Sequence, residues 1–273
     1  MAIARVNGTA LFYEIVGTGL PCLVLHGGMG LDHTYFHPWL DPLGDLLQLI
    51  SYDQRGNGRS SPSSCENLTF DQLCRDADAL RATRNVEHVA LLGHSFGGFV
   101  ALEYALRYPH RVSHLILVGT APSFDYAEEI QANVQRKNPT AETLAAVSAP
   151  PPATDADFAR LWHALLPLYF HNYDSVLMER AFGQTIYRGA AAACNDTLFA
   201  VYNVAARLGE IQAPTLVVVG DDDFVCPPSQ ARRLQLGIPN AQLTILSACG
   251  HFPFIECAAA FEATVRSWLA QIP

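Results

Sequence analysis

Short apolar runs recur along the chain, each bounded by glycine, proline or charged residues. Six of them cover residues 21–28, 46–56, 88–95, 114–122, 214–223 and 241–251. These runs are nearly continuously apolar rather than alternating, which is typical of strands buried on both faces of a parallel sheet. A hairpin is predicted ahead of them, because two β-rich arms in residues 3–17 flank Asn7-Gly8, a strong hairpin signal.

Helical patterns separate the predicted strands. They cover residues 68–84, 99–109 and 254–272, and Thr69 is the predicted N-cap of the first. Strands and helices in alternation predict an α/β fold with a mostly parallel central sheet and helices on both faces. In such a fold, binding sites lie at the carboxyl ends of the strands.

The alternation stops after Pro122. Residues 123–207 contain helical segments at 155–170 and 174–187 and a proline-rich stretch at 149–154, but no run that predicts a buried strand. We therefore expect a core made of residues 1–122 and 208–273. Residues 123–207 are predicted to form an inserted helical cap over the strand ends.

Composition narrows the function classes. Half of the 273 residues are hydrophobic and 16% are charged, the net charge is −9, and no 18 apolar residues follow one another. These values predict a globular protein that does not bind a membrane. Nucleic acid is an unsuitable partner because the basic residues are few and dispersed. We expect a small-molecule substrate and leave a homodimer open.

The cysteines suggest free thiols. There are seven, an odd number without a C-x-x-C pair, which favours a reducing cytoplasm over a disulfide scaffold. A signal-peptide pattern is missing from the first residues, so a cytoplasmic location is expected. The seven are Cys22, Cys65, Cys74, Cys194, Cys226, Cys249 and Cys257.

The first candidate for chemistry is Ser95. Residues 93–97 read Gly-His-Ser-Phe-Gly, which matches the G-x-S-x-G nucleophile elbow between a strand and a helix. The alternative is a structural turn that needs its glycines. A nucleophilic serine requires a base and a carboxylate, which in this arrangement follow in the order Ser, Asp or Glu, His.

The chain supplies both partners directly after predicted strands. Three aspartates occupy 221–223, and we choose Asp223 as the acid; His251 is the predicted base. An oxyanion hole needs two backbone N–H groups. We assign them to Phe96, directly after the serine, and to Gly28 in the glycine-rich loop 26–30, for which a plain glycine turn is the alternative.

The other histidines are given structural roles. His26 is expected to brace its glycine loop through a hydrogen bond, and His94 to point away from the serine. His33 and His37 have helical i,i+4 spacing but lack a third ligand in the sequence. We therefore predict no metal site and no cofactor.

Apolar residues of the loop and the cap are expected to form a wall over the serine, although helix packing is the alternative for most of them. The predicted pocket residues are Met29, Phe124, Trp162, Tyr169 and Phe170. Acidic residues also occur in the cap, where solvated helix faces explain them best. They are Asp125, Glu128, Glu129, Glu142, Asp155, Asp157, Asp174, Glu179 and Asp196.

Taken together, these motifs resemble the α/β-hydrolase fold enzymes. The resemblance rests on residues 26–30, 53–60, 93–98, 220–227 and 250–254 in that order. Residues 53–60 and the stretch 32–36 look most like the proline iminopeptidase (peptidase S33) branch. That branch removes N-terminal proline, and its members use cap carboxylates to hold the substrate ammonium.

Two departures from that branch move the predicted substrate toward esters. Met29 stands where these iminopeptidases usually have proline, and GHSFG replaces their GGSWG. The GHSFG form is commoner among esterases and carbon–carbon bond hydrolases of the fold. The sequence thus predicts a serine hydrolase acting on a small to medium carboxylic ester, with a proline iminopeptidase-type enzyme as the alternative. A carbon–carbon bond hydrolase or a non-hydrolytic receptor ranks lower.

Overall fold

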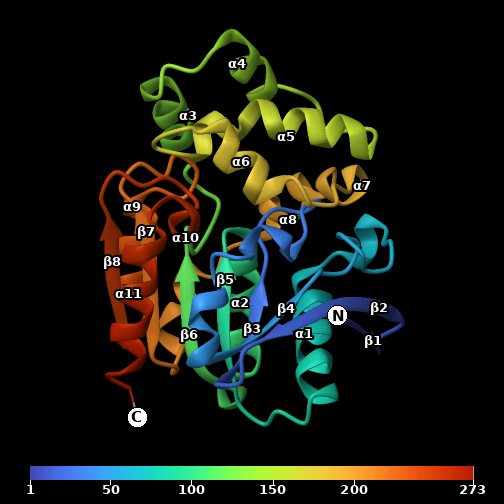
Figure 1. Ribbon diagram of the computed structural model, residues 1–273, viewed down its shortest axis with the longest axis vertical. Coiled ribbons are helices and arrows are strands. Elements are labelled where there is room, and N and C mark those ends of the chain that lie inside the picture. Colours follow the sequence, from blue (N-terminus) through green and yellow to red (C-terminus); the bar gives the residue numbers. More distant parts are fainter. Residues whose placement is uncertain (273) are drawn as a thin grey trace.

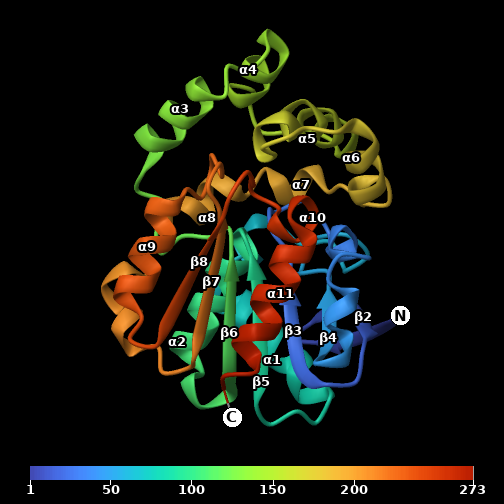
Figure 2. The ribbon, with the colours of Figure 1, turned by 60° about the vertical axis from the view of Figure 1, so that its left-hand side comes forward.

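A computed structural model describes residues 1–272, which fold around one eight-stranded sheet of order β1-β2-β4-β3-β5-β6-β7-β8 (Figures 1 and 2). β1 pairs with β2 and β2 pairs with β4 in antiparallel fashion. All other neighbouring pairs of the sheet are parallel. This confirms the predicted α/β class with a mostly parallel sheet. The strands are β1 (Ala2–Val6), β2 (Thr9–Val16), β3 (Leu20–Leu25), β4 (Leu47–Tyr52), β5 (Val89–His94), β6 (Val112–Val118), β7 (Thr215–Gly220) and β8 (Ala241–Leu246).

The hairpin is where the sequence predicts it. Val6 of β1 pairs with Thr9 of β2, and the two residues between them have φ values of 46° at Asn7 and 73° at Gly8. Two consecutive positive φ values match the type I′ turn that Asn-Gly favours.

Successive residues of the central strands pack into two different cores. Leu91 of β5 belongs to the core under α1 (Phe70–Thr83), α2 (Phe96–Arg107) and α9 (Pro228–Gly237). Its neighbour Leu92 belongs to the core under α11 (Ala258–Leu269), which lies on the opposite face (Figure 2). β5 and β7 are buried throughout, which explains their continuous apolar runs.

The elements differ from the predictions in several ways. β8 is an edge strand and only partly buried, so the expectation of burial on both faces is wrong for it. α2 begins at Phe96 rather than residue 99, directly after the serine. The single helix predicted over 254–272 is two helices, α10 (Pro253–Glu256) and α11, separated at Cys257.

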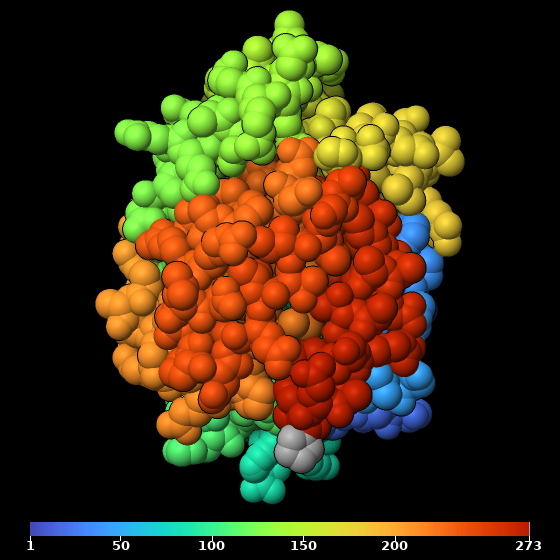
Figure 3. All heavy atoms as spheres, turned by 90° about the vertical axis from the view of Figure 1, so that its left-hand side faces the viewer, coloured from blue at the N-terminus to red at the C-terminus, as the bar shows by residue number. Residues whose placement is uncertain are grey.

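The chain between β6 and β7 forms a helical lobe over the carboxyl ends of the strands (Figure 1). Its green and yellow atoms form the upper end of the molecule in Figure 3. The lobe joins the sheet region where its two ends meet: Val204 N–H donates to Pro122 O at 2.8 Å, and Ser123 pairs with Asn203. We propose residues 123–207 as the cap on this basis. Its helices are α3 (Ala127–Arg136), α4 (Ala141–Val147), α5 (Asp155–Tyr169), α6 (Ser175–Phe182), α7 (Gly189–Ala192) and α8 (Asn195–Val201).

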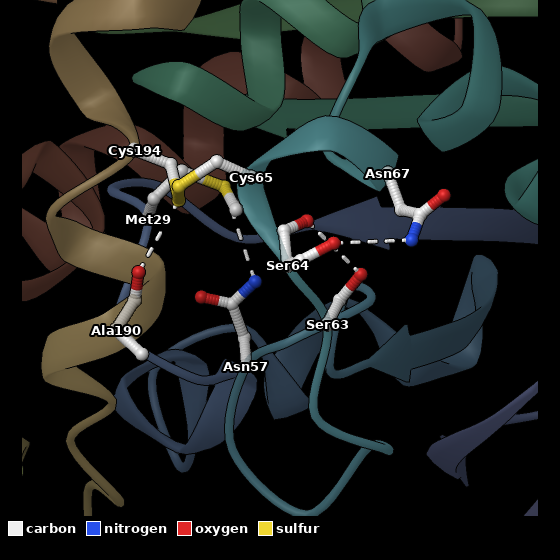
Figure 4. The surroundings of a disulfide bond; sticks show 8 residues. All are labelled: Met29, Asn57, Ser63, Ser64, Cys65, Asn67, Ala190 and Cys194. Atoms are coloured by element: carbon white, nitrogen blue, oxygen red, sulfur yellow. Dashed lines mark hydrogen bonds between the residues drawn. A yellow bond between two sulfur atoms is a disulfide. The ribbon is translucent and has the colours of Figure 1, made fainter.

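The prediction that all cysteines are free is wrong. Cys65 and Cys194 form a disulfide across 129 residues of sequence (Figure 4). It connects a 3₁₀ helix before α1, η3 (Cys65–Asn67), to the start of α8 in the cap. Sequence spacing could not reveal this pair, because only the folded chain brings the two segments together. The cysteine argument for a cytoplasmic location is therefore lost. No helix among residues 1–272 is long and apolar enough to cross a bilayer.

Candidate active site

Ser95 occupies the sharp turn between β5 and α2, with φ 54° and ψ −122°. Side chains on the flanking glycines would collide with the backbone. A Cβ at Gly93 would lie 2.5 Å from Gly97 O, and one at Gly97 would lie 2.0 Å from Leu25 O. The glycines therefore allow helix and strand to approach closely while the serine takes a conformation that is unfavourable for a residue with a Cβ.

His251 and Asp223 form a buried pair at the ends of the last two strands. His251 Nδ1–H donates to Asp223 Oδ2 at 2.7 Å, and each residue is 1% exposed. The other carboxylate oxygen, Oδ1, accepts from the backbone N–H groups of Val225 at 3.1 Å and Cys226 at 2.9 Å. These bonds hold the carboxylate in one orientation against the imidazole.

The two neighbouring aspartates have other partners. Asp221 is exposed and accepts from Cys249 N–H at 3.3 Å. Asp222 pairs with the Lys137 ammonium of the cap at 2.6 Å. Partial burial alone would raise the pKa of Asp222, but the hydrogen bond and charge of Lys137 outweigh it, so the pKa of that carboxyl is lowered. Of the three, Asp223 is the one that reaches His251.

His94 connects the serine turn to the loop that carries His251. Its Nε2–H donates to His251 O at 3.0 Å, and the two ring centroids are 4.8 Å apart. Because Ser95 follows His94 directly, this bond fixes the backbone of the serine beside that of the histidine. The cap contributes on the other side, since His251 N–H donates to Tyr169 O at 2.7 Å.

A further hydrogen-bond chain runs from His94 to the glycine loop. Tyr35 O–H donates to His94 Nδ1 at 3.0 Å and accepts from Gly27 N–H at 2.5 Å. Burial, and secondarily the charge of His251, hold the pKa of His94 well below its usual range, so the neutral ring accepts at Nδ1 and donates at Nε2. As predicted from the sequence, His94 does not face the cavity; its partner Tyr35 was missed.

The glycine loop lies against the serine. A Cβ at Gly27 would lie 2.9 Å from Ser95 Cβ, and Gly28 has φ +48°. His26 braces the loop as expected: Nδ1–H donates to Gly27 O at 2.9 Å, and Nε2 accepts from Gln54 N–H at 3.0 Å.

The backbone N–H groups of Gly28 and Phe96 have no acceptor in residues 1–272, and both residues line the same cavity as Ser95. The two groups predicted for the oxyanion hole are thus unpaired beside the serine.

The cavity has a volume of about 260 Å³ and extends from Ser95 into the cap. Four of the predicted pocket residues, Met29, Phe124, Trp162 and Tyr169, line it. Phe170 differs: it is 1% exposed, and its ring stacks on Phe252 with centroids 5.2 Å apart. Because α5 ends at Tyr169, the side chain of Phe170 leaves the helix in another direction and packs in the core.

Asp196 is the carboxylate of this cavity. Of the nine acidic cap residues named above, it alone is among the lining residues in the described part of the chain. It lies in the first turn of α8 and is exposed to solvent, so it lies at the mouth of the cavity, where the cavity meets solvent. Sequence reasoning had no signal that separated it from the other cap acids.

The family model for the alpha/beta hydrolase fold matches residues 21–258. A proline iminopeptidase of Pestalotiopsis fici is 34% identical, with 97% of this chain and 98% of that protein covered. A proline iminopeptidase of Lactiplantibacillus plantarum is 30% identical over the same shares. Among solved structures, the enol-lactonase of Burkholderia xenovorans is 27% identical with a TM-score of 0.76, covering 98% of this chain and 100% of the other.

Proposed function

The chain belongs to the α/β-hydrolase fold family and is a hydrolase, and from this premise we propose that it cleaves an N-terminal residue, proline in the first instance, from a small peptide. The sequence alone predicted an esterase first and a proline iminopeptidase-type enzyme second, and this proposal reverses that order. The reason for the change is that the most similar relatives reported above are proline iminopeptidases along nearly their full length.

The proposed mechanism uses Ser95 as nucleophile. His251 takes the proton of Ser95 Oγ as the oxygen attacks the carbonyl carbon, and the N–H groups of Gly28 and Phe96 donate to the resulting oxyanion. Collapse breaks the carbon–nitrogen bond, and His251 returns the proton to the leaving amine. Water then attacks the acyl-enzyme, with His251 again as base, and releases the acid and Ser95.

Asp223 acts through His251 in this mechanism. Its carboxylate accepts from Nδ1–H, which leaves the unprotonated Nε2 as the atom that can receive the serine proton. Once His251 is protonated, the adjacent negative charge stabilises the imidazolium.

The observation that carries the aminopeptidase proposal is Asp196 at the mouth of a small, mostly apolar cavity. A carboxylate there can pair with the free ammonium group of a substrate, a secondary ammonium in the case of proline, whose acyl carbon lies at Ser95. The volume of about 260 Å³ is below that of common drug-sized pockets, which suits one small residue better than a long acyl chain.

Ester or lactone hydrolysis is the second candidate. It is favoured by the aromatic lining of the cavity and by the similarity to an enol-lactonase. The same serine chemistry serves both reactions, so the two candidates differ in how the substrate is held and not in the catalytic groups.

A substrate pair tests the proposal. Wild type and Ser95→Ala are compared on proline p-nitroanilide and p-nitrophenyl butyrate, and both are treated with a fluorophosphonate probe. We expect labelling and anilide turnover only in wild type. Strong ester turnover with negligible anilide turnover would select the second candidate, and equal labelling of Ser95→Ala would reject the serine mechanism.

Asp196→Asn tests the amine contact. Loss of one charged contact at an exposed position should raise KM for the prolyl anilide about ten-fold, or about 1.4 kcal/mol, and leave KM for the neutral ester unchanged. Glu142→Gln is the matched control, because Glu142 is an exposed cap acid outside the cavity lining. An equal effect of both variants would show that overall cap charge, not the contact, matters.

A further inference from the structure

A second group of chemically active side chains lies outside the cavity described above. Glu14 extends from β2, His33 begins the 3₁₀ helix η1 (His33–Phe36), and His37 follows that helix. One ligand atom from each of the three lies within 4.8 Å of the others. None of the three lines the Ser95 cavity, so the serine mechanism does not account for them.

Both histidines have a ring nitrogen without a hydrogen bond. His33 Nε2 and His37 Nε2 are buried and have no hydrogen-bond partner in residues 1–272. The His33 side chain is fully buried, and the two rings meet edge to face with centroids 5.9 Å apart. A buried polar atom without a partner is destabilising, so two in one place favour a ligand that satisfies both.

The other nitrogen of each ring is held by a carboxylate. His33 Nδ1 is 2.5 Å from Asp53 Oδ1, and His37 Nδ1 is 2.6 Å from Asp41 Oδ1. When Nδ1 carries the proton that these bonds need, Nε2 holds a lone pair. Metal-binding histidines commonly have this arrangement, in which an outer carboxylate fixes the tautomer and the ring orientation.

We propose that Glu14, His33 and His37 bind one divalent transition-metal ion, with Zn²⁺ as the preferred ion. Two imidazole nitrogens and one carboxylate are a ligand set that Zn²⁺ accepts, with a fourth position left for water. Glu14 is 27% exposed, so the fourth position has access to solvent. The third ligand, which the local sequence around His33 and His37 does not supply, is Glu14 of the β1–β2 hairpin at the edge of the sheet.

The charges around the cluster favour a cation. Asp32 and Asp53 are fully buried nearby, and Arg59 is their cationic partner, at 3.4 Å and 3.9 Å. Glu14 adds a third carboxylate, with Oε2 3.7 Å from His33 Nε2. Three carboxylates against one guanidinium leave a net negative charge that favours a bound cation.

The test is metal binding by the full chain after treatment with a chelator. Calorimetric titration with ZnCl₂ should show one ion per chain, and saturating Zn²⁺ should raise the Tm because the ion binds only the folded state. Co²⁺ in place of Zn²⁺ should give the visible bands of a tetrahedral nitrogen and oxygen site.

The variants are chosen at partly exposed positions so that they fold. His37→Gln and Glu14→Gln should each lower the affinity at least ten-fold, and Asp41→Asn, which removes only an outer carboxylate, should lower it less. His110→Gln is the control, because His110 is an exposed histidine elsewhere on the surface. Circular dichroism verifies that each variant is folded.

Two results would overturn the proposal. The thiols of Cys249 and Cys257 are also hydrogen-bonded to each other. If one Zn²⁺ still binds to the double variant His37→Gln/Glu14→Gln but not to Cys257→Ser, these two thiols are the ligands. If wild type binds no Zn²⁺, His33 is instead a protonated partner of Asp53 and Glu14. Hydrolase activity is not used as a readout, so neither result depends on the proposed function.

Discussion

At the scale of single residues, the three aspartates after β7 show how position selects chemistry. Asp221, Asp222 and Asp223 are adjacent, yet one is exposed, one pairs with a cap lysine and one is buried against His251. A strand end turns successive side chains in different directions, and so only one of three equivalent carboxylates is placed to orient the imidazole.

Asp223→Asn should lower kcat/KM by about 10³- to 10⁴-fold, because an amide favours the wrong tautomer of the histidine. Asp221→Asn and Asp222→Asn should stay within a few-fold of wild type. Steady-state kinetics on the best substrate of the pair above gives the ranking. A larger loss in either neighbour would mean that the catalytic acid is not Asp223.

Tyr35→Phe should lower kcat about ten-fold with little change in KM. The variant leaves Gly27 N–H and His94 Nδ1 unpaired, and both the oxyanion loop and the turn of the serine depend on that hydroxyl. Tyr104→Phe is the control, since Tyr104 is also buried and donates to Asp78 at 2.9 Å away from the cavity. If both variants lose only stability, Tyr35 is structural and has no positioning role.

At the scale of elements, the disulfide ties the cap to the core. Cys194 precedes α8, the helix that carries Asp196, and Cys65 lies in η3 ahead of α1. Met29 of the cavity wall lies in the surroundings of the bond and accepts from Asn57 Nδ2 at 3.9 Å (Figure 4). The bond thus connects the helix at the cavity mouth to the body of the protein.

Cys65→Ser should lower the free energy of unfolding by at most about 4–5 kcal/mol, the chain-entropy value for a loop of this length. The loop spans 129 residues, so the cross-link restricts the unfolded chain strongly. Urea unfolding with and without reductant measures the effect. Cys257→Ser is the control because Cys257 is free; identical unfolding of oxidised wild type and Cys65→Ser would contradict the disulfide.

At the scale of the whole molecule, buried neutral histidines make stability depend on pH. Burial lowers the pKa of His26, although Asp53 opposes this, and it lowers the pKa of His94 further. In the unfolded chain both rings have a pKa near 6.5. Below that pH the unfolded state binds protons that the folded state does not, so acidification favours unfolding.

We therefore expect the free energy of unfolding to fall as the pH drops below about 6.5, by up to about 1.4 kcal/mol per pH unit for each histidine. Burial also lowers the pKa of His114, which therefore acts in the same direction. His33 acts in the opposite direction because its folded pKa is raised, but it is one group against three. Urea midpoints at several pH values measure the slope. His94→Asn should reduce the slope, and a midpoint that rises on acidification would contradict the expectation.

Much of the architecture follows from local rules in the sequence. The apolar runs predicted the strands, Asn7-Gly8 predicted the hairpin, and Thr69 predicted the start of α1, where its side chain accepts from Gln72 N–H at 3.2 Å. Strands follow from the spacing of apolar residues, hairpins from the conformations that turn residues can adopt, and helix starts from N-capping side chains. All three involve residues close together in the chain. The order of Ser95, Asp223 and His251, which follow the ends of β5, β7 and β8, could be read in the same way.

The tertiary structure decided what depends on distances between remote segments. It joined Cys65 to Cys194, brought Glu14 to the His33 and His37 pair, and placed Asp196 at the cavity mouth. In each case, side chains from segments far apart in the sequence come together, and no local pattern specifies how far apart they lie in the folded chain. Local patterns determine which element a residue belongs to, but the packing of elements determines which side chains meet, and the chemistry of the sites depends on those meetings.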